Sequence, residues 1–148
     1  MPRLVLICAS IVALSAVVGV PPVRTQDSDD ARPSLALRAT PAISFSPASV
    51  LLVGELRGGP DDYEEFYCAT IEWDWGDGTR SSSTFDCEPY EPGATDIQRR
   101  FSVRHLFRRS GRYEVMLRLK QDDDVVEFAA TTVQVHPGIG QRHAVAFR

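Results

Sequence analysis

The sequence lacks most of the motifs that mark enzymes and nucleic-acid-binding proteins. It contains no G-x-S-x-G nucleophile motif, no phosphate-binding loop and no dinucleotide-binding fingerprint. Lys120 is the only lysine, and the formal net charge of −4 argues against a general role in binding nucleic acid. No internal repeat is present, and 148 residues are enough for one domain with its appendages. These absences favour a single domain without an assembled catalytic site.

The sequence also lacks amphipathic helices, because no segment of about ten residues or more shows a convincing 3.6-residue apolar period. It contains instead a series of short segments with strand-like composition and alternation. Such a series over about 100 residues predicts an all-β fold, an Ig-like antiparallel β-sandwich of about seven strands, with a closed barrel as the alternative. The candidate strands are residues 35–39, 42–46, 49–56, 69–75, 79–85, 97–107, 113–120 and 125–136.

The two ends of the chain differ in composition from this β-rich part. Residues 1–20 resemble a secretory signal peptide, with a short positive start, an uncharged apolar run and candidate cleavage after Ala16 or Gly19. An uncleaved N-terminal anchor is the alternative, and only then would the protein be attached to a membrane. The expected localisation is therefore secreted, periplasmic or at the cell surface. The predicted organisation is a flexible spacer at 21–34, a domain at 35–136 and a flexible tail at 137–148.

The stretch WDWGDGT, residues 73–79, combines a turn signal with two tryptophans. Asp77-Gly78 is a strong signal for a two-residue hairpin turn, because both central positions of a type I′ turn need positive φ. A turn centred there sets Cys68 opposite Cys87, since each lies equally far from its own turn residue. In an oxidising compartment the two thiols are expected to form a disulfide.

The predicted register conflicts with disulfide geometry in one respect. In an unbroken ladder the two cysteines would form a hydrogen-bonded pair, whereas cross-strand disulfides fit the closer geometry of non-hydrogen-bonded pairs. A bulge near Gly76, or a cysteine outside the ladder, would remove the conflict. Alternation places Trp73 and Trp75 on one face of their strand, and we expect at least one of them in the core.

WDWGDGT resembles the WDFGDG signature of the PKD (polycystic kidney disease) domain family, and residues 105–119 resemble its later H-x-[YF]-x-x-x-G-x-Y-x-V-x-L segment. The resemblance covers residues 35–136 and implies an Ig-like β-sandwich. It implies a turn at Gly111, a tyrosine corner at Tyr113 and a structural role for His105. The cysteine pair and the 86–100 insertion depart from the family pattern. The matched signature positions are Trp73, Asp74, Trp75, Gly76, Asp77, Gly78, His105, Phe107, Gly111 and Tyr113.

The carboxylates of Asp74 and Asp77 raise the question of a catalytic or metal site. Two acids on one tight turn do not form the cleft that general acid–base chemistry needs, so we predict no catalytic residue and no enzymatic activity. Hydrogen bonding to the turn backbone explains both acids. Calcium is the alternative ligand for this pair, although the loop lacks the spaced ligands of an EF-hand, and otherwise no cofactor is expected.

The arginines are concentrated in one part of the sequence, between residues 99 and 112. They predict a basic patch for an acidic polymer or protein surface, with a solubilising, ion-paired face as the alternative. The 86–100 loop adds an aromatic side chain, and long loops on rigid sandwiches often carry recognition. The predicted binding surface consists of Tyr90, Arg99, Arg100 and Arg104. The sequence thus predicts an exported, non-enzymatic module that binds a protein or polysaccharide, or alternatively a structural spacer stabilised by calcium.

Overall fold

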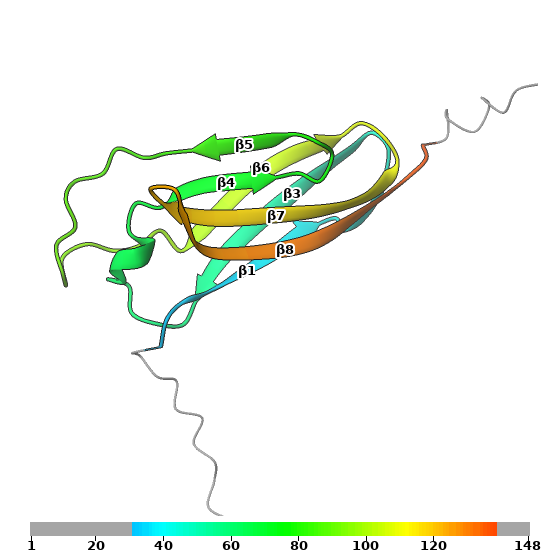
Figure 1. Cartoon of the computed structure of the whole chain (residues 1–148). Helices are drawn as coiled ribbons and strands as arrows, with labels where there is room; N and C mark the ends of the chain where they lie inside the picture. The colour runs from blue at the N-terminus through cyan, green and yellow to red at the C-terminus, as the bar shows by residue number, and fades with distance from the viewer. Residues whose placement is uncertain (1–30, 139–148) are drawn as a thin grey trace, which may run out of the picture.

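A computed structural model describes residues 31–138 of the chain. The described part contains eight β-strands and one short 3-10 helix, so its regular structure is almost entirely β (Figure 1). The predicted signal peptide, most of the predicted spacer and most of the predicted tail lie outside the described residues. The elements are β1 Ser34–Thr40, β2 Ile43–Phe45, β3 Ala48–Arg57, η1 Glu64–Phe66, β4 Thr70–Asp74, β5 Arg80–Ser83, β6 Arg100–Phe107, β7 Gly111–Gln121 and β8 Asp124–His136.

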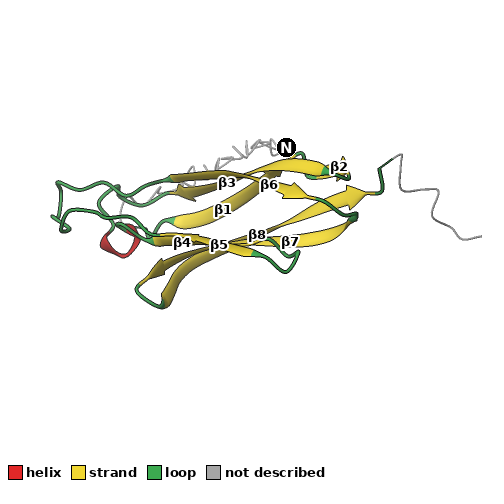
Figure 2. Ribbon diagram, turned by 90° about the horizontal axis from the view of Figure 1, so that it is seen from above, coloured by secondary structure: helices red, strands yellow, loops and turns green. Residues whose placement is uncertain are grey.

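The strands form two sheets that pack face to face. One sheet has the strand order β1-β3-β6, and the other has the order β2-β8-β7-β4-β5. Figure 2 shows β1, β3 and β6 in one layer and β4, β5, β7 and β8 in the other. This arrangement confirms the predicted all-β sandwich and excludes the closed barrel. All strand pairs are antiparallel except β2 with β8, which is parallel.

Alternation of buried and outward-facing residues along the strands builds the core between the layers. On β7, Val115, Leu117 and Leu119 are buried. On β3, Val50 and Leu52 point to the same interior. Because side chains alternate between the two faces of a strand, the intervening residues form the outer surface of each sheet.

Both tryptophans of WDWGDGT are buried, and they begin a column of stacked rings. Trp73 stacks on Trp75 at 5.4 Å between ring centroids, and Trp75 stacks on His105 at 4.2 Å. Phe107 continues the column between His105 and Tyr113. The column joins β4 of one sheet to β6 of the other. Ring contacts of this kind add to the stability that burial of the side chains provides.

The β4–β5 turn corrects one prediction from the sequence. Trp73 pairs with Ser81 rather than Ser82, and the Trp75 N–H donates to the Thr79 carbonyl at 3.1 Å, which leaves Gly76, Asp77 and Gly78 as the loop. The predicted two-residue type I′ turn is therefore wrong by one residue. Hydrogen bonds from the Thr79 N–H and hydroxyl to the Asp77 carboxylate stabilise the wider turn instead.

The predicted disulfide between Cys68 and Cys87 is present, with 6.1 Å between the two Cα atoms. Neither cysteine lies in the β4–β5 ladder, which runs from Ile71 paired with Ser83 to Asp74 paired with Arg80. A position outside the ladder is one of the two conditions under which the geometric conflict disappears. The bridge ties the start of β4 to the long connection between β5 and β6.

The connection from residue 84 to residue 99 extends beyond the ends of the strands, next to η1 (Figure 1). It is held to the domain at several points. The Tyr67 hydroxyl donates to the Glu88 carbonyl at 2.9 Å, and the Ile97 N–H donates to the Asp61 carbonyl at 2.7 Å. Ile97 is also buried, so the connection has its own anchor in the core.

Candidate functional site

The outer face of the three-stranded sheet has the most distinctive chemistry of the described surface. Cross-strand pairs place Ala36 beside Glu55, and Glu55 beside Arg100. One row further along, Arg38 lies beside Val53, and in the next row Leu51 lies beside Arg104. Because paired residues on adjacent strands point to the same face, these side chains form one continuous surface. We call this surface the basic face and define it by Ala36, Arg38, Thr40, Leu51, Val53, Glu55, Arg57, Arg100, Ser102 and Arg104.

The basic face has an apolar centre and a charged margin. Leu51 and Val53 are half-buried, whereas Arg38, Arg100 and Arg104 are exposed. A hollow of about 470 Å³ lies over this part of the sheet. Its lining consists of Ala36, Leu37, Arg38, Thr40, Leu51, Val53, Glu55, Arg57 and Arg100.

Glu55 is the only acid on the basic face, and arginines surround it. Arg57 donates to the Glu55 carboxylate at 2.9 Å and 3.1 Å. These hydrogen bonds and the charge of Arg57 lower the pKa of Glu55, with further contributions from the charges of Arg100 and Arg38. Glu55 therefore stays ionised and offsets the charge of one of the four arginines. The basic face keeps a net positive charge, although the chain as a whole has a net charge of −4.

The predicted binding surface is only partly assembled in the structure. Arg100 and Arg104 lie on the basic face, but Arg99 points elsewhere: its guanidinium donates to the carbonyls of Gly58 and Gly59 at 2.9 Å each, and it pairs with Asp61. Arg99 therefore fastens the loop after β3 to the start of β6. These contacts give Arg99 a structural role, and it does not lie on the basic face.

Tyr90 is likewise used inside the domain. Its hydroxyl donates to the Asp62 carbonyl at 2.5 Å, and its ring packs against Tyr67.

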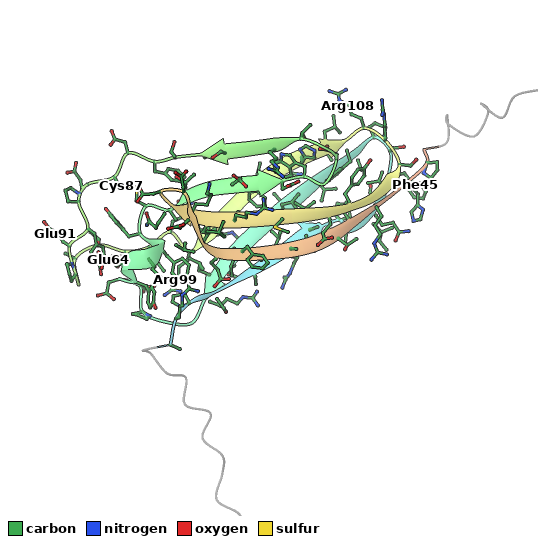
Figure 3. All side chains as sticks on the ribbon, in the orientation of Figure 1. Phe45, Glu64, Cys87, Glu91, Arg99 and Arg108 are labelled. Atoms are coloured by element: carbon green, nitrogen blue, oxygen red, sulfur yellow. A yellow bond between two sulfur atoms is a disulfide. The ribbon has the colours of Figure 1, made fainter. Side chains whose placement is uncertain are left out.

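The other arginines between residues 99 and 112 do not lie on the basic face with Arg100 and Arg104. Arg99 and Arg108 lie at opposite ends of the sandwich, so the arginine-rich segment is spread along β6 rather than gathered (Figure 3).

Arg38 and Arg57 are the residues of the basic face that sequence reasoning missed. The signal was present, because alternation puts Arg38 on the face of β1 opposite to Ala39, and Arg57 on the face of β3 opposite to Leu56. Alternation alone does not say which strands are neighbours. The order β1-β3-β6 brings the arginines of three separate segments together, and that order could not be obtained from the pattern.

The carboxylate oxygens of Asp74 and Asp77 already accept hydrogen bonds or ion pairs. The Asp74 carboxylate accepts from the Gly76 N–H at 3.2 Å and from the Arg80 guanidinium at 3.0 Å. Asp77 accepts from the Thr79 N–H at 2.9 Å and contacts the His105 imidazole at 2.8 Å. These contacts support the predicted role as turn acceptors and count against the calcium alternative. Among residues 31–138, no group of three or more His, Cys, Asp or Glu side chains is arranged to hold a metal ion.

The pKa of Asp77 reflects two opposing effects. Partial burial alone would raise it, but hydrogen bonds from Thr79 and the contact with His105 outweigh burial and hold the pKa below its usual value. Within the described chain, the nearby Thr79 hydroxyl donates to Asp77 rather than to His105, so the pair is not arranged as a base that activates this hydroxyl. The Tyr113 hydroxyl donates to the Arg109 carbonyl at 2.8 Å, as expected for a tyrosine corner.

Comparisons with known proteins give a fold likeness and little more. No protein-family model matches the chain, and no curated protein matches it. Among solved structures, the chain is similar to the CARDB domain of the PF1109 protein from Pyrococcus furiosus, solved in complex with di-metal ions, with a TM-score of 0.41 and 10% sequence identity over 70% of this chain and 92% of that chain. Since a fold does not define a ligand, this likeness adds nothing to the chemistry of the basic face. Within the described residues no helix is long and apolar enough to cross a membrane.

Proposed function

We propose that this domain is a non-enzymatic binding module that holds an acidic macromolecule, protein or polysaccharide, on its basic face. The observation that carries the proposal is the gathering of Arg38, Arg57, Arg100 and Arg104 around an apolar hollow, with Glu55 as the only acid. The planar arginine guanidinium matches carboxylate and sulfate groups with paired hydrogen bonds. The half-buried Leu51 and Val53 add apolar contact at the centre.

The composition of the basic face favours an acidic ligand over a neutral sugar. No aromatic side chain lines the hollow, so the face offers no stacking platform for an uncharged sugar ring. It also offers no catalytic pair, because Glu55 is its single carboxylate and is held ionised by Arg57. A binding role needs neither feature.

The proposal includes export and membership of the PKD family. Export rests on the resemblance of residues 1–20 to a signal peptide and is consistent with the disulfide between Cys68 and Cys87. The family assignment rests on the WDWGDGT stretch and the tyrosine corner at Tyr113. The module would then act in the periplasm, at the cell surface or outside the cell.

The test compares two triple variants with equal loss of charge. Arg38→Ala/Arg100→Ala/Arg104→Ala removes three arginines of the basic face, whereas Arg108→Ala/Arg109→Ala/Arg112→Ala removes three exposed arginines at the β6–β7 turn. Titration with polyglutamate and with a sulfated polysaccharide, followed by calorimetry, gives the dissociation constants. We expect the first variant to bind at least one of these probes about tenfold more weakly or worse, and the second to bind like the wild type.

The rival function is a structural spacer with no ligand. The outer face of the five-stranded sheet comes closer to that role, because Arg118 pairs with Glu72 at 3.0 Å and Arg80 pairs with Asp74 at 3.0 Å, so these four charges offset one another. If both probes bind the wild type and the two triple variants equally, or bind none of them, the basic face has no binding role and the spacer is the better description.

A further inference from the structure

We propose that the partner is a protein that adds an extended acidic segment, as a new strand, to the free edge of β6. This inference rests on the proposed binding role of the basic face and names the class of ligand. It follows from the position of β6 in the fold, from the direction of its backbone groups and from the charges that its outer face presents.

β6 is the last strand of the three-stranded sheet, and within the described part of the chain one of its edges pairs with no other strand. The opposite end of this sheet is different, because β1 lies alongside β8 of the other layer. An unpaired edge presents a row of backbone donors and acceptors that an added strand can use. At eight residues, β6 is long enough to hold such a strand.

The hydrogen bonding with β3 shows which residues of β6 face the free edge. The Leu56 N–H donates to the Arg99 carbonyl at 2.8 Å, and these two residues continue the register of the β3–β6 ladder. Hydrogen-bonded and non-hydrogen-bonded pairs alternate in an antiparallel ladder. The odd-numbered residues of β6 therefore bond to β3, and Arg100, Ser102, Arg104 and Leu106 direct their N–H and C=O groups outward.

Most of these outward backbone groups are available. The Arg100 carbonyl accepts from the Gln98 side chain at 3.0 Å, which marks the end of the usable edge. The alternation directs the N–H and C=O groups of Ser102, Arg104 and Leu106 away from β3, and within residues 31–138 no backbone hydrogen bond outside the strand ladders involves them. A residue of an added antiparallel strand that lies opposite one of these residues would donate its N–H to that residue's C=O and accept from that residue's N–H.

The same residues also carry the side chains of the outer face. An added antiparallel strand would place its own side chains opposite Leu106, Arg104, Ser102 and Arg100 in that order. The complementary sequence, written from its N-terminus, has an apolar residue, an acid, a polar residue and a second acid at alternate positions. The arginines thus specify the charge of the partner, and the edge specifies its extended conformation.

A second copy of this chain fits the edge poorly. Antiparallel pairing of β6 with β6 would bring two sets of Arg100 and Arg104 onto one continuous sheet, and like charges in such positions repel. A polysaccharide would neutralise the arginines but has no N–H and C=O groups at strand spacing. The edge of β5 is also less suited, because β5 has four residues and its one charge, on Arg80, is already paired with Asp74.

The experiment uses three short peptides with the apolar–acid–polar–acid alternation. The first is unmodified. The second is N-methylated at the residues opposite Ser102 and Leu106, whose N–H groups the proposed pairing uses, and the third is N-methylated at two intervening residues, whose N–H groups point away from β6. We expect the second peptide to bind about tenfold more weakly or worse than the first, and the third to bind like the first.

Two readouts on the protein complete the test. Amide hydrogen exchange at Ser102, Arg104 and Leu106 should slow when the unmodified peptide binds. Ser102→Pro removes one N–H donor at the free edge and leaves the hydrogen bonds to β3 in place, so it should weaken peptide binding. Ser102→Ala keeps that N–H and should bind the peptide like the wild type. Thermal unfolding should show that both variants fold.

The outcomes separate the strand inference from the proposed function. If the three peptides bind equally but the Arg38/Arg100/Arg104 variant loses them all, the basic face binds acids without strand addition and the inference fails alone. If that variant binds the peptides and the sulfated polysaccharide as well as the wild type does, the strand inference and the proposed function both fail. Slow exchange at the three edge amides without peptide, together with dimers in sedimentation, would assign the edge to a second copy and also overturn the inference.

Discussion

Asp77 is the residue at which the β4–β5 turn and the aromatic column meet. Its carboxylate accepts from Thr79 within the turn and contacts His105, which stacks on Trp75. A single side chain thus fixes the turn and orients a ring of the column, across the two sheets. The signature positions around it are occupied by residues that stabilise the fold, and none of them lies on the basic face.

The contacts of Asp77 predict a particular dependence of stability on pH. Because its pKa is lower in the folded state than in the unfolded chain, its contribution is complete above the usual aspartate pKa of about 3.9 and is lost as the pH falls through the folded value. Asp77→Asn should lower the free energy of unfolding near neutral pH by about 1–2 kcal/mol and flatten its decline in acid. Urea unfolding at a series of acidic pH values measures both effects.

The matched control for this prediction is Asp123→Asn, in the exposed β7–β8 turn. It should leave the acid dependence of the unfolding free energy unchanged. A wild-type curve that parallels that of Asp77→Asn throughout the acid range would contradict the assignment of this stability to Asp77.

At the scale of elements, the β4–β5 turn contains two glycines with different constraints. Gly76 has φ of 70°, and an added Cβ would lie 2.6 Å from the Glu114 carbonyl oxygen of β7. Gly78 has φ of 90°, but the space around it is open. Gly78→Ala should therefore cost about 1 kcal/mol from its backbone conformation alone, whereas Gly76→Ala should cost more than about 2 kcal/mol because β7 must also shift. Chemical denaturation of the two variants measures the difference, and equal losses would refute it.

The disulfide is the second element-scale feature with a measurable effect. It closes a loop with a sequence separation of 19, for which loop-closure entropy predicts a stabilisation of about 3 kcal/mol. The double variant Cys68→Ser/Cys87→Ser should lose about that amount in urea unfolding. It should keep its sheet content, because the bridge lies outside the β4–β5 ladder. Reduced wild-type protein is the matched control, and an unfolding free energy unaffected by reduction would contradict the prediction.

The elements also show where sequence reasoning succeeds and where it stops. Alternation identified the buried face of β4, because a period of two residues is local information. On β3 both faces carry apolar residues, so alternation alone did not say which face is buried. The turn was misplaced by one residue, because Gly76-Asp77-Gly78 supports both a two-residue and a three-residue loop. Arg99 and Tyr90 were assigned to a surface because their acceptors, in the loop after β3, are distant in sequence.

At the scale of the whole molecule, charge is separated between faces. The basic face carries four arginines and one glutamate, whereas the chain as a whole has a net charge of −4. On the outer face of the other sheet, two ion pairs offset four of the charges, Arg118 with Glu72 and Arg80 with Asp74. No single strand encodes this separation, because it arises only when β1, β3 and β6 lie side by side.

This separation predicts how binding to an acidic ligand depends on salt. Screening shortens the range of charge interactions from about 30 Å at 0.01 M salt to about 8 Å at 0.15 M. The association rate constant for an acidic peptide should therefore fall steeply with salt, while the dissociation rate constant changes little. Stopped-flow or surface-based kinetics at a series of salt concentrations gives both constants.

The two triple arginine variants distinguish local from overall charge in this experiment. At low salt both should slow association, because each makes the net charge of −4 more negative by the same amount and the long-range repulsion of an acidic ligand is unscreened. At 0.15 M salt Arg38→Ala/Arg100→Ala/Arg104→Ala should be clearly the slower variant, since its arginines lie within the basic face whereas those at the β6–β7 turn lie past the end of β6. Association that is slowed equally by both variants at 0.15 M would show that overall charge, and not this face, attracts the ligand.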